Sequence, residues 1–299
     1  MNILGIDVGN ANVNSSNGVV FESRVKPGIT TMNENDIKVV YGGVEYTLGT
    51  IDGALNIRKN KHKKAAYKLS LLTAIAKSYK TKTINCSVVV GVPVEDFNNK
   101  ALRADIKEII EAWGTEKITI NDENKTINIE KAEVFCESAI VFSDREKFKT
   151  EKTLVIDLGG STVDVSFWDG LVQLDSRTYK EGMISLYETI AKALNNKFES
   201  KLESHMVKNC IGKNEFEINQ DVKDIKFIDI IVENYIDGLT SYINQYFSID
   251  AANSIQVIGG GAIQLFDKIK EEYESAVLVE DAAFANANTY KKIGDVIWI

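Results

Sequence analysis

Two short segments of the sequence place a carboxylate and a glycine directly after a run of apolar residues. The first covers residues 6–12 and contains Asp7 and Gly9, and the second covers residues 154–164 and contains Asp157. Glycine permits the positive φ angles that turn consecutive backbone N–H groups toward one point, and such a nest binds phosphate oxygens. Asp and Gly are also ordinary turn residues, so either segment alone could be a plain β-turn.

The second segment makes the stronger case for a ligand, because residues 159–162 (Gly-Gly-Ser-Thr) combine bare backbone with two hydroxyl groups. Asp157 is expected to face the same space as Asp7, since both follow a strand. Two carboxylates that flank a polyphosphate repel each other unless a cation lies between them, which implies Mg²⁺ held through water. Two unrelated β-turns are the alternative.

A third cluster, Gly259, Gly260 and Gly261, follows an apolar run at 254–258 and precedes a predicted helix. Three successive glycines present bare backbone, against which an adenosine would fit. A helix N-terminus with a flexible entry is the alternative. The cluster matches neither GxGxxG nor GxxxxGK[ST], so neither a dinucleotide fingerprint nor a P-loop is indicated.

The apolar runs predict the strands that carry these turns. Residues 3–8 predict a strand with a hairpin partner at 19–25, and residues 153–157 predict a strand with a return strand at 163–168. Both halves of the chain therefore repeat one plan. The run at 83–91 is continuously apolar, which is typical of a strand buried on both faces of a parallel sheet. Further strands are predicted at 37–41, 44–48, 118–120, 127–129, 132–135, 254–258 and 276–279, and helices at 63–79, 100–113, 183–198, 227–247, 262–273 and 282–292, with another helix opening at Glu137.

Length, charge and cysteine content restrict the class of protein. A chain of 299 residues is long enough for two domains that each bury a core. Its net charge of −8 disfavours direct binding to nucleic acid. The three cysteines are isolated and odd in number, so neither a disulfide framework nor a cysteine metal site is indicated. The sequence has no signal-peptide or membrane-spanning pattern, and we expect a soluble, cytoplasmic protein.

Together the motifs resemble those of the actin superfamily. The segments at 6–12 and 154–164 resemble its two phosphate loops, and residues 258–262 resemble its adenosine loop. Residues 132–139 and 281–288 are similar to its two connecting helices. All five motifs occur in the family's order, which unrelated turns would match only by a remote coincidence.

Within the superfamily, the chain most resembles plasmid-segregating actins of the ParM type, on its short length and on residues 90–93 and 283–286. Thr289 stands where the second connecting helix usually has glycine. The resemblance implies an α/β, duplicated ribonuclease H-like (actin-like ATPase) fold, with two domains around a nucleotide cleft and a five-stranded type of sheet in each. The implied domain I spans residues 1–146, with the helix at 282–299 returning to it, and domain II spans 147–281. Insertions at 26–82 and 186–250 would form two outer lobes.

The resemblance also implies a role for each motif residue. Asp7 and Asp157 would hold the Mg²⁺ shell, Asp157 and Glu137 would serve catalysis, and Glu137 would polarise the attacking water. The alternative for Glu137 is a helix N-terminal residue favoured by the helix dipole. The implied nucleotide-binding residues are Asp7, Gly9, Asn10, Ala11, Asn12, Gly159, Gly160, Ser161, Thr162, Gly259, Gly260 and Gly261.

One position departs from the family pattern. Many relatives have a lysine seven residues after the first Asp, which neutralises the β-phosphate, whereas this chain has Asn14. Either another cation substitutes or hydrolysis is altered. The basic run at 58–64 could contact DNA or a neighbouring subunit, although a solvated face is the favoured interpretation. His62 and His205 are isolated in the sequence, so we expect neither to bind a metal or act as a nucleophile.

The implied function is an ATPase, with GTP as an open alternative, that polymerises into filaments and segregates plasmid DNA through a DNA-bound adaptor of the ParR type. The chain itself would contact neither DNA nor membrane. Three alternatives remain at this point: a sugar or acid kinase, a chaperone-type ATPase, and a cell-shape or division actin.

Overall fold

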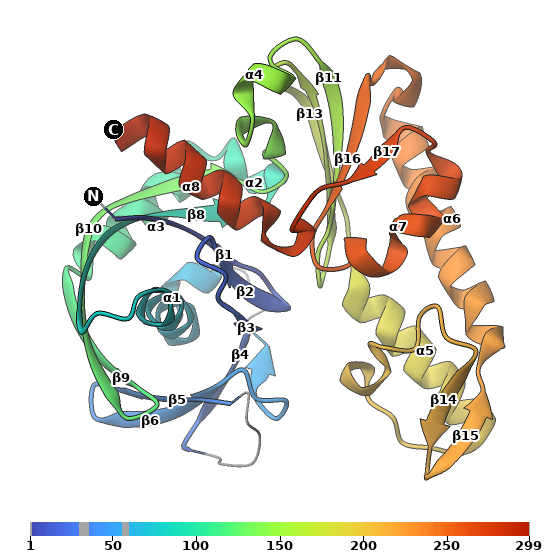
Figure 1. Ribbon diagram of the computed structural model, residues 1–299, viewed down its shortest axis with the longest axis horizontal. Helices are drawn as coiled ribbons and strands as arrows, with labels where there is room; N and C mark the ends of the chain where they lie inside the picture. Colours follow the sequence, from blue (N-terminus) through green and yellow to red (C-terminus); the bar gives the residue numbers. More distant parts are fainter. Residues whose placement is uncertain (1, 30–35, 56–59, 299) are drawn as a thin grey trace.

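The computed structural model describes residues 2–29, 36–55 and 60–298 and contains two large sheets (Figure 1). The first has ten strands, and all of them come from the first half of the chain. In spatial order these are β3 (Val20–Glu22), β2 (Asn12–Ser15), β1 (Ile3–Val8), β8 (Thr83–Val92), β10 (Glu123–Cys136), β9 (Thr115–Ile120), β5 (Ile37–Tyr41), β6 (Val44–Leu48), β4 (Arg24–Pro27) and β7 (Ala54–Leu55).

The second large sheet has five strands from the second half of the chain. In spatial order these are β13 (Val172–Tyr179), β12 (Val163–Asp169), β11 (Lys152–Leu158), β16 (Ser254–Ile258) and β17 (Ala276–Leu278). A separate hairpin is formed by β14 (Glu215–Ile218) and β15 (Asp221–Asp224). The hairpin lies at the same end of the molecule as β4, β5 and β6, so segments of both predicted insertions project in one direction (Figure 1).

The duplicated plan is present in the strand pairing. β1 is antiparallel to β2 with Asp7 opposite Asn14, and β11 is antiparallel to β12 with Asp157 opposite Asp164. Each central strand also has a parallel neighbour, β8 for β1 and β16 for β11. This arrangement places both aspartates at the carboxyl end of a central strand, where ligands bind in α/β sheets.

The prediction that residues 19–25 pair with β1 is wrong. β1 pairs with the strand that follows at once, β2, and β3 is the next strand outward. β2 has the sequence Asn-Val-Asn-Ser, whose residues other than valine have low or modest β-propensity. It is nevertheless held in the sheet because Val13 and Ser15 are fully buried.

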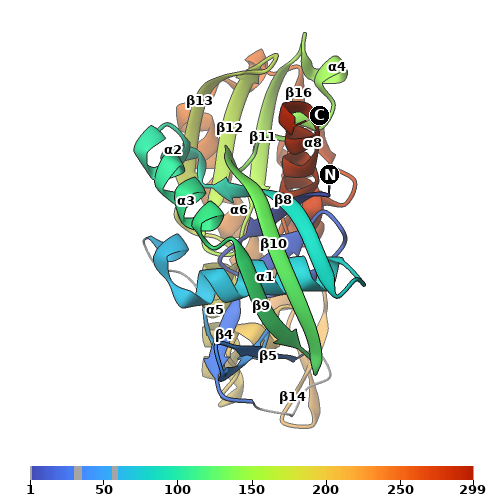
Figure 2. The ribbon, with the colours of Figure 1, turned by 90° about the vertical axis from the view of Figure 1, so that its left-hand side faces the viewer.

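The prediction of a five-stranded sheet in the first half of the chain is also wrong. The sheet continues through β9 into β5, β6, β4 and β7, strands that lie in or next to the predicted insertion at 26–82. The reason is the length of β10, which was predicted as two strands separated near Glu130. Its 14 residues form one uninterrupted strand. The pairing with β8 shifts register between Ile129 and Lys131 and then continues beyond the charged pair Glu130–Lys131. Figure 2 shows β10 extending along most of the sheet.

The helices pack on the faces of these sheets. The long helices match the predicted segments closely: α1 (Ala65–Ser78), α3 (Lys100–Ala112), α5 (Met183–Phe198), α6 (Asp229–Tyr246), α7 (Ala262–Glu272) and α8 (Ala285–Trp298), while α2 (Val94–Phe97) and α4 (Arg145–Phe148) are short. None of the described helices is long and apolar enough to cross a bilayer. The predicted helix opening at Glu137 is wrong: Glu137 lies in a turn, Ser138 has a φ of 60°, and only a 3-10 turn over Ile140–Phe142 follows.

Helix α8 lies against β1 and β8 of the first sheet although it comes from the far end of the chain (Figure 1). The packing is close enough to require glycine in both strands. A β-carbon at Gly5 would stand 1.9 Å from the carbonyl oxygen of Ala287, and one at Gly91 would stand 2.3 Å from the Tyr290 hydroxyl. The helix is therefore seated directly on the strand that carries the first turn.

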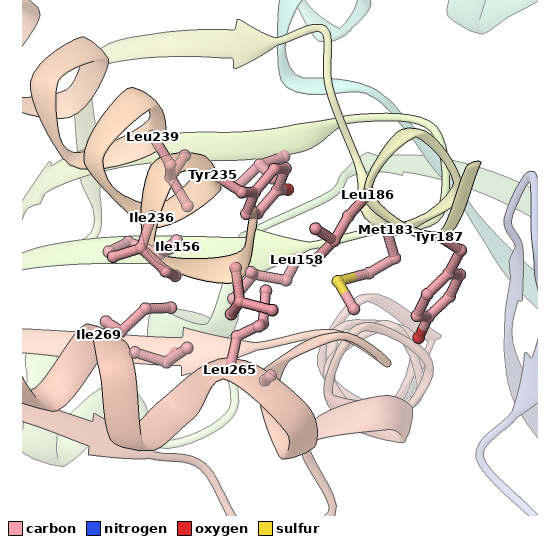
Figure 3. Close-up of a cluster of buried hydrophobic side chains, with 14 of the residues drawn as sticks. Ile156, Leu158, Met183, Leu186, Tyr187, Tyr235, Ile236, Leu239, Leu265 and Ile269 are labelled. Carbon is pink, nitrogen blue, oxygen red and sulfur yellow. The ribbon is translucent and has the colours of Figure 1, made fainter. Parts of the chain in front are cut away.

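A buried apolar cluster packs against β11, the strand that leads into the β11–β12 turn (Figure 3). Ile156 and Leu158 of β11 pack with Leu186 of α5, Leu239 of α6 and Leu265 of α7. Full burial of each such side chain stabilises the fold by about 1.5–3 kcal/mol. Because α5 and α7 begin beside the glycine-containing turns, this cluster fixes those turns relative to one another.

Candidate functional site

A cavity of about 270 Å³ lies where the β1–β2 turn, the β11–β12 turn and the loop after β16 meet. It is lined by every residue that the sequence motifs indicated: Asp7, Gly9, Asn10, Ala11, Asn12, Glu137, Asp157, Gly159, Gly160, Ser161, Thr162, Gly259, Gly260 and Gly261. These residues come from three widely separated parts of the sequence, and the duplicated strands together with β16 bring them to one place.

The two aspartate-bearing turns have the same internal geometry. A β-carbon at Gly9 would stand 2.8 Å from the carbonyl oxygen of Asn12, and one at Gly159 would stand 2.8 Å from that of Thr162. The turns also touch each other, because a β-carbon at Gly160 would stand 2.4 Å from that of Ala11. Any side chain at position 160 would therefore push the two turns apart.

The loop after β16 uses its glycines for different reasons. Gly259 has a φ of 92°, and a β-carbon there would stand 2.5 Å from Asp157 Oδ1. A β-carbon at Gly261 would meet Met183 at 2.5 Å, whereas one at Gly260 has only Asn12 Nδ2 nearby, at 4.0 Å. Gly259 and Gly261 are thus required by packing, and Gly260 leaves open space in the cavity.

Asp157 and Asp164 form the buried carboxylate pair of the second turn, with side chains only 6% and 3% exposed. The pKa of Asp157 is raised to about 8, mainly by burial and also by the charges of Asp7 and Asp164, while a hydrogen bond from Asn286 opposes the shift. Burial likewise raises the pKa of Asp164 to about 6, although Asp164 accepts a hydrogen bond of 2.6 Å from Thr178 Oγ1.

Asp7 and Glu137 complete the acidic set. Burial raises the pKa of Asp7, and Lys61 and Asn286 oppose that rise. The pKa of Glu137 is raised well above its ordinary value, first by burial and then by the charges of Asp164 and Asp7, while Lys61 again opposes. Carboxylates that resist ionisation together accept a cation readily, because a positive charge stabilises the ionised form of each.

Asn286 connects three parts of the site, a role that the sequence did not reveal. Its Nδ2 donates to Asp157 Oδ2 at 2.7 Å, and its Oδ1 accepts from the backbone N–H of Ser138 at 3.1 Å. Asn286 lies on α8, so this helix joins the end of β11 to the turn that holds Glu137. The only sequence signal for this role is that Asn286 is the one polar residue in the alanine-rich segment 282–287.

Lys61 is the second residue that was missed. It lines the cavity, and its Nζ donates to the carbonyl oxygen of Val8 at 2.5 Å. The interpretation of the whole basic run at 58–64 as a solvated face is therefore wrong at this residue. His62 and Lys63 both pair with Asp105 instead, at 3.1 Å and 2.8 Å, and Arg58 and Lys59 lie outside the described residues.

The remaining wall of the cavity comes from α5, α7 and the segment after α5. Tyr187 donates its hydroxyl to Gln264 Oε1 at 3.0 Å. Lys208 Nζ lies 2.5 Å from Glu22 Oε1, an ion pair between lining residues from the two halves of the chain. His205 also lines the wall, 3.3 Å from a carboxylate oxygen of Glu203. The lining thus combines acidic side chains and glycines with the side chains of Tyr187 and Met183.

The donor set fits a phosphate-bearing ligand with Mg²⁺. Ser161 Oγ and Asn14 Oδ1 both belong to lining residues and are buried with no hydrogen-bond partner among the described residues. Such orphaned groups cost about 1–3 kcal/mol each unless a ligand satisfies them. Across the described residues, no three metal-ligating side chains gather to hold a metal unaided. Mg²⁺ needs no such cage, because it is commonly bound through one or two carboxylates, waters and substrate phosphates.

Two family models match the sequence in succession. Residues 5–139 match the model "Actin like proteins N terminal domain", and residues 148–290 match the model "Plasmid segregation protein ParM, C-terminal". Together the two matches span nearly the whole described chain. No curated protein matches the sequence significantly.

Solved structures resemble the fold over its full length. An archaeal actin homologue, Ta0583, has a TM-score of 0.84 at 15% identity, with 99% of each chain covered. A ParM from a filament of Clostridium botulinum has a TM-score of 0.79 at 20% identity, with 99% of this chain and 100% of that chain covered. The ParM protein of psk41 has a TM-score of 0.73 at 18% identity, with 99% and 97% covered. At these identities the likeness establishes the fold, which confirms the predicted two-domain actin-like architecture.

The duplicated turns, the shared cavity and both family matches agree with one another. The chain belongs to the actin-like proteins, and within them to the ParM type.

Proposed function

We propose that this protein binds ATP with Mg²⁺ in the cavity between its two sheets, hydrolyses it, and polymerises into filaments that segregate plasmid DNA. The observation that carries the proposal is the meeting of the two aspartate-bearing turns at Ala11 and Gly160, with the Ser161 hydroxyl orphaned beside them. The filament and the plasmid task are supported by the membership of the ParM type, and by the similar protein that was solved in a filament.

The turns at 9–12 and 159–162 would bind the phosphates through backbone N–H groups and hydroxyls, and Gly259–Gly261 would lie against the adenosine. Gly260 suits this role because it leaves the cavity open beside it. Asp7 and Asp157 would hold the Mg²⁺ shell, and the metal would supply charge neutralisation for the transferred phosphoryl group.

Glu137 would orient and deprotonate the attacking water. Glu137 lies in a turn and not at a helix N-terminus. The alternative role of stabilising a helix dipole therefore does not apply to it. Burial raises the pKa of Glu137 and so strengthens it as a base, and the positive charge of Lys61 favours its ionised form.

We also propose that residues 1–146 with 282–299 form one domain and residues 147–281 the other. The separate strand sets of the two sheets and the seating of α8 on β1 support this division. An adaptor of the ParR type would link the filament to DNA in the cytoplasm, consistent with the net charge of −8.

Sedimentation and electron microscopy of the purified protein with Mg·ATP test the proposal. We expect polymer with ATP, and phosphate release that Asp157→Ala abolishes and Glu137→Ala slows by about 10²-fold without loss of ATP binding. Glu133→Gln is the matched control, because Glu133 lies on β10, four residues before Glu137, and pairs with Lys107 outside the cavity. Absence of polymer at any protein concentration would contradict the filament, and transfer of phosphate to an added sugar or acid would favour a kinase.

A further inference from the structure

Lys61 differs from the other basic side chains that line the cavity. Arg24 and Lys208 both form ion pairs with Glu22, at 3.2 Å and 2.5 Å. Within the described residues Lys61 has no carboxylate in ion-pair contact, and its ammonium group bonds to the carbonyl oxygen of Val8. Its charge acts on Asp7 and Glu137 from a distance, but no carboxylate of the described chain occupies its ammonium group, which can therefore bind an anion directly, unlike Arg24 and Lys208.

The ammonium group of Lys61 sits at the first turn itself. Val8 directly follows Asp7, and the bond to its carbonyl oxygen places Nζ at the point where β1 ends. On the neighbouring strand β2, Asn14 stands opposite Asp7, at the position where the superfamily resemblance implies a lysine in many relatives, and its side-chain oxygen is orphaned. Lys61, which comes 47 positions after Asn14, therefore brings a positive charge to the end of β1.

The local structure holds Lys61 in place. It begins a 3-10 turn, Lys61–Lys63, that leads into α1, and Asn60 before it adopts a left-handed conformation with a φ of 58°. The next two residues point the other way, since His62 and Lys63 both contact Asp105. An ammonium group has three donors, and the Val8 carbonyl takes one of them, so two remain for ligand oxygens.

We propose that Lys61 binds the β-phosphate of the nucleotide, the role that the superfamily resemblance implies for a lysine at position 14. This inference rests on the proposed function, because it assigns a residue to a nucleoside di- or triphosphate in the same cavity. Lys61 comes from the lobe that contains α1 and β4–β7. The phosphate contact therefore ties that lobe to the nucleotide, and ADP retains the contact while adenosine cannot make it.

Binding of ADP and adenosine to Lys61→Met tests the proposal. We expect ADP affinity to fall by between about 10-fold and 100-fold, as for loss of a hydrogen bond to a charged group, and adenosine affinity to be unchanged. Lys61→Arg should recover part of the ADP affinity. Lys63→Met, which alters a 52% exposed lysine of the same turn, is the matched control and should bind both ligands normally. Equal ADP affinity in Lys61→Met and the unaltered protein would overturn the inference, as would an equal loss for both ligands.

Lysine acetylation of the unaltered protein decides the question if Lys61→Met does not fold. ADP should protect Lys61 from acetylation, adenosine should not, and Lys63 should react equally in all three states. Acetylation of Lys61 that ADP leaves unchanged would overturn the inference while ADP binding itself still upheld the nucleotide site. An unaltered protein that binds neither ADP nor ATP would instead contradict the proposed function.

Discussion

The contact between the two aspartate-bearing turns makes Gly160→Ala the sharpest test of the cleft. The new methyl carbon would stand 2.4 Å from the β-carbon of Ala11, and carbon atoms in contact settle at about 3.5–4.0 Å. The turns must therefore separate by about 1 Å or more. They belong to different sheets, so the two halves of the chain can open slightly instead of straining one core.

We expect Gly160→Ala to reduce ATP turnover by about 10²-fold, the loss typical of a 1 Å misplacement of reacting groups. Stability should fall by only about 1–3 kcal/mol, the usual cost of an overpacked contact. Phosphate release at saturating Mg·ATP measures the first effect, and denaturant unfolding measures the second.

The matched variant is Ala11→Gly combined with Gly160→Ala, which moves the methyl group from one turn to the other. The nearest atoms to the new β-carbon are then the backbone N and Cα of residue 11, at 3.1 Å and 3.3 Å, so a shift of a few tenths of an ångström suffices. Turnover of the double variant should recover to within about tenfold of the unaltered protein. A Gly160→Ala turnover within twofold of normal, or a double variant no faster than the single one, would refute the reasoning.

Three further predictions follow from the same contacts. Because the pKa of Asp157 is raised to about 8 in the folded state, the folded protein holds a proton that the unfolded chain releases near pH 4. Stability of the Mg²⁺-free protein should therefore fall as pH rises from 4 to 8, by at most about 1.4 kcal/mol per pH unit. In Asp157→Asn the melting temperature should depend less on pH across that range. A stability that rises with pH in the unaltered protein would contradict this. Asn286→Leu leaves Asp157 and the Ser138 N–H without their partner, so urea unfolding should show a loss of about 2–4 kcal/mol, and a loss below 0.5 kcal/mol would argue against the bridge. Glu22→Gln removes the ion pairs to Lys208 and Arg24. Release of fluorescent ADP in stopped-flow measurements should then accelerate severalfold, while stability changes by less than about 1 kcal/mol because these pairs are partly exposed. An unchanged release rate would exclude a closing role for these ion pairs.

The sequence predicted those parts of the site that are formed by short continuous segments. Asp7 and Asp157 each follow an apolar strand and precede a glycine turn, and the repetition of that pattern predicted a shared space. Lys61 and Asn286 carry no such local pattern. Each reaches the cavity through packing between distant segments, α1 and its preceding turn in one case and α8 on β1 in the other.

The errors in the fold have the same origin. β2 consists of Asn-Val-Asn-Ser, and its place in the sheet comes from pairing with β1 and burial of Val13, not from its own propensity. In β10 the charged pair Glu130–Lys131 resembles a loop between two strands, yet pairing with β8 continues on both sides of it. Local composition indicates where strands are favourable, and the neighbouring strand decides where they begin and end.

The seating of α8 on β1 has a consequence for the order of synthesis. A chain that leaves the ribosome from its N-terminus presents β1 early, but the helix that covers Gly5 emerges only after residue 284. Until then Asp157 lacks the amide of Asn286, and the turn that holds Glu137 lacks its acceptor. All strands of the five-stranded sheet emerge before α8, so the cleft reaches its final form only after α8 has been synthesised.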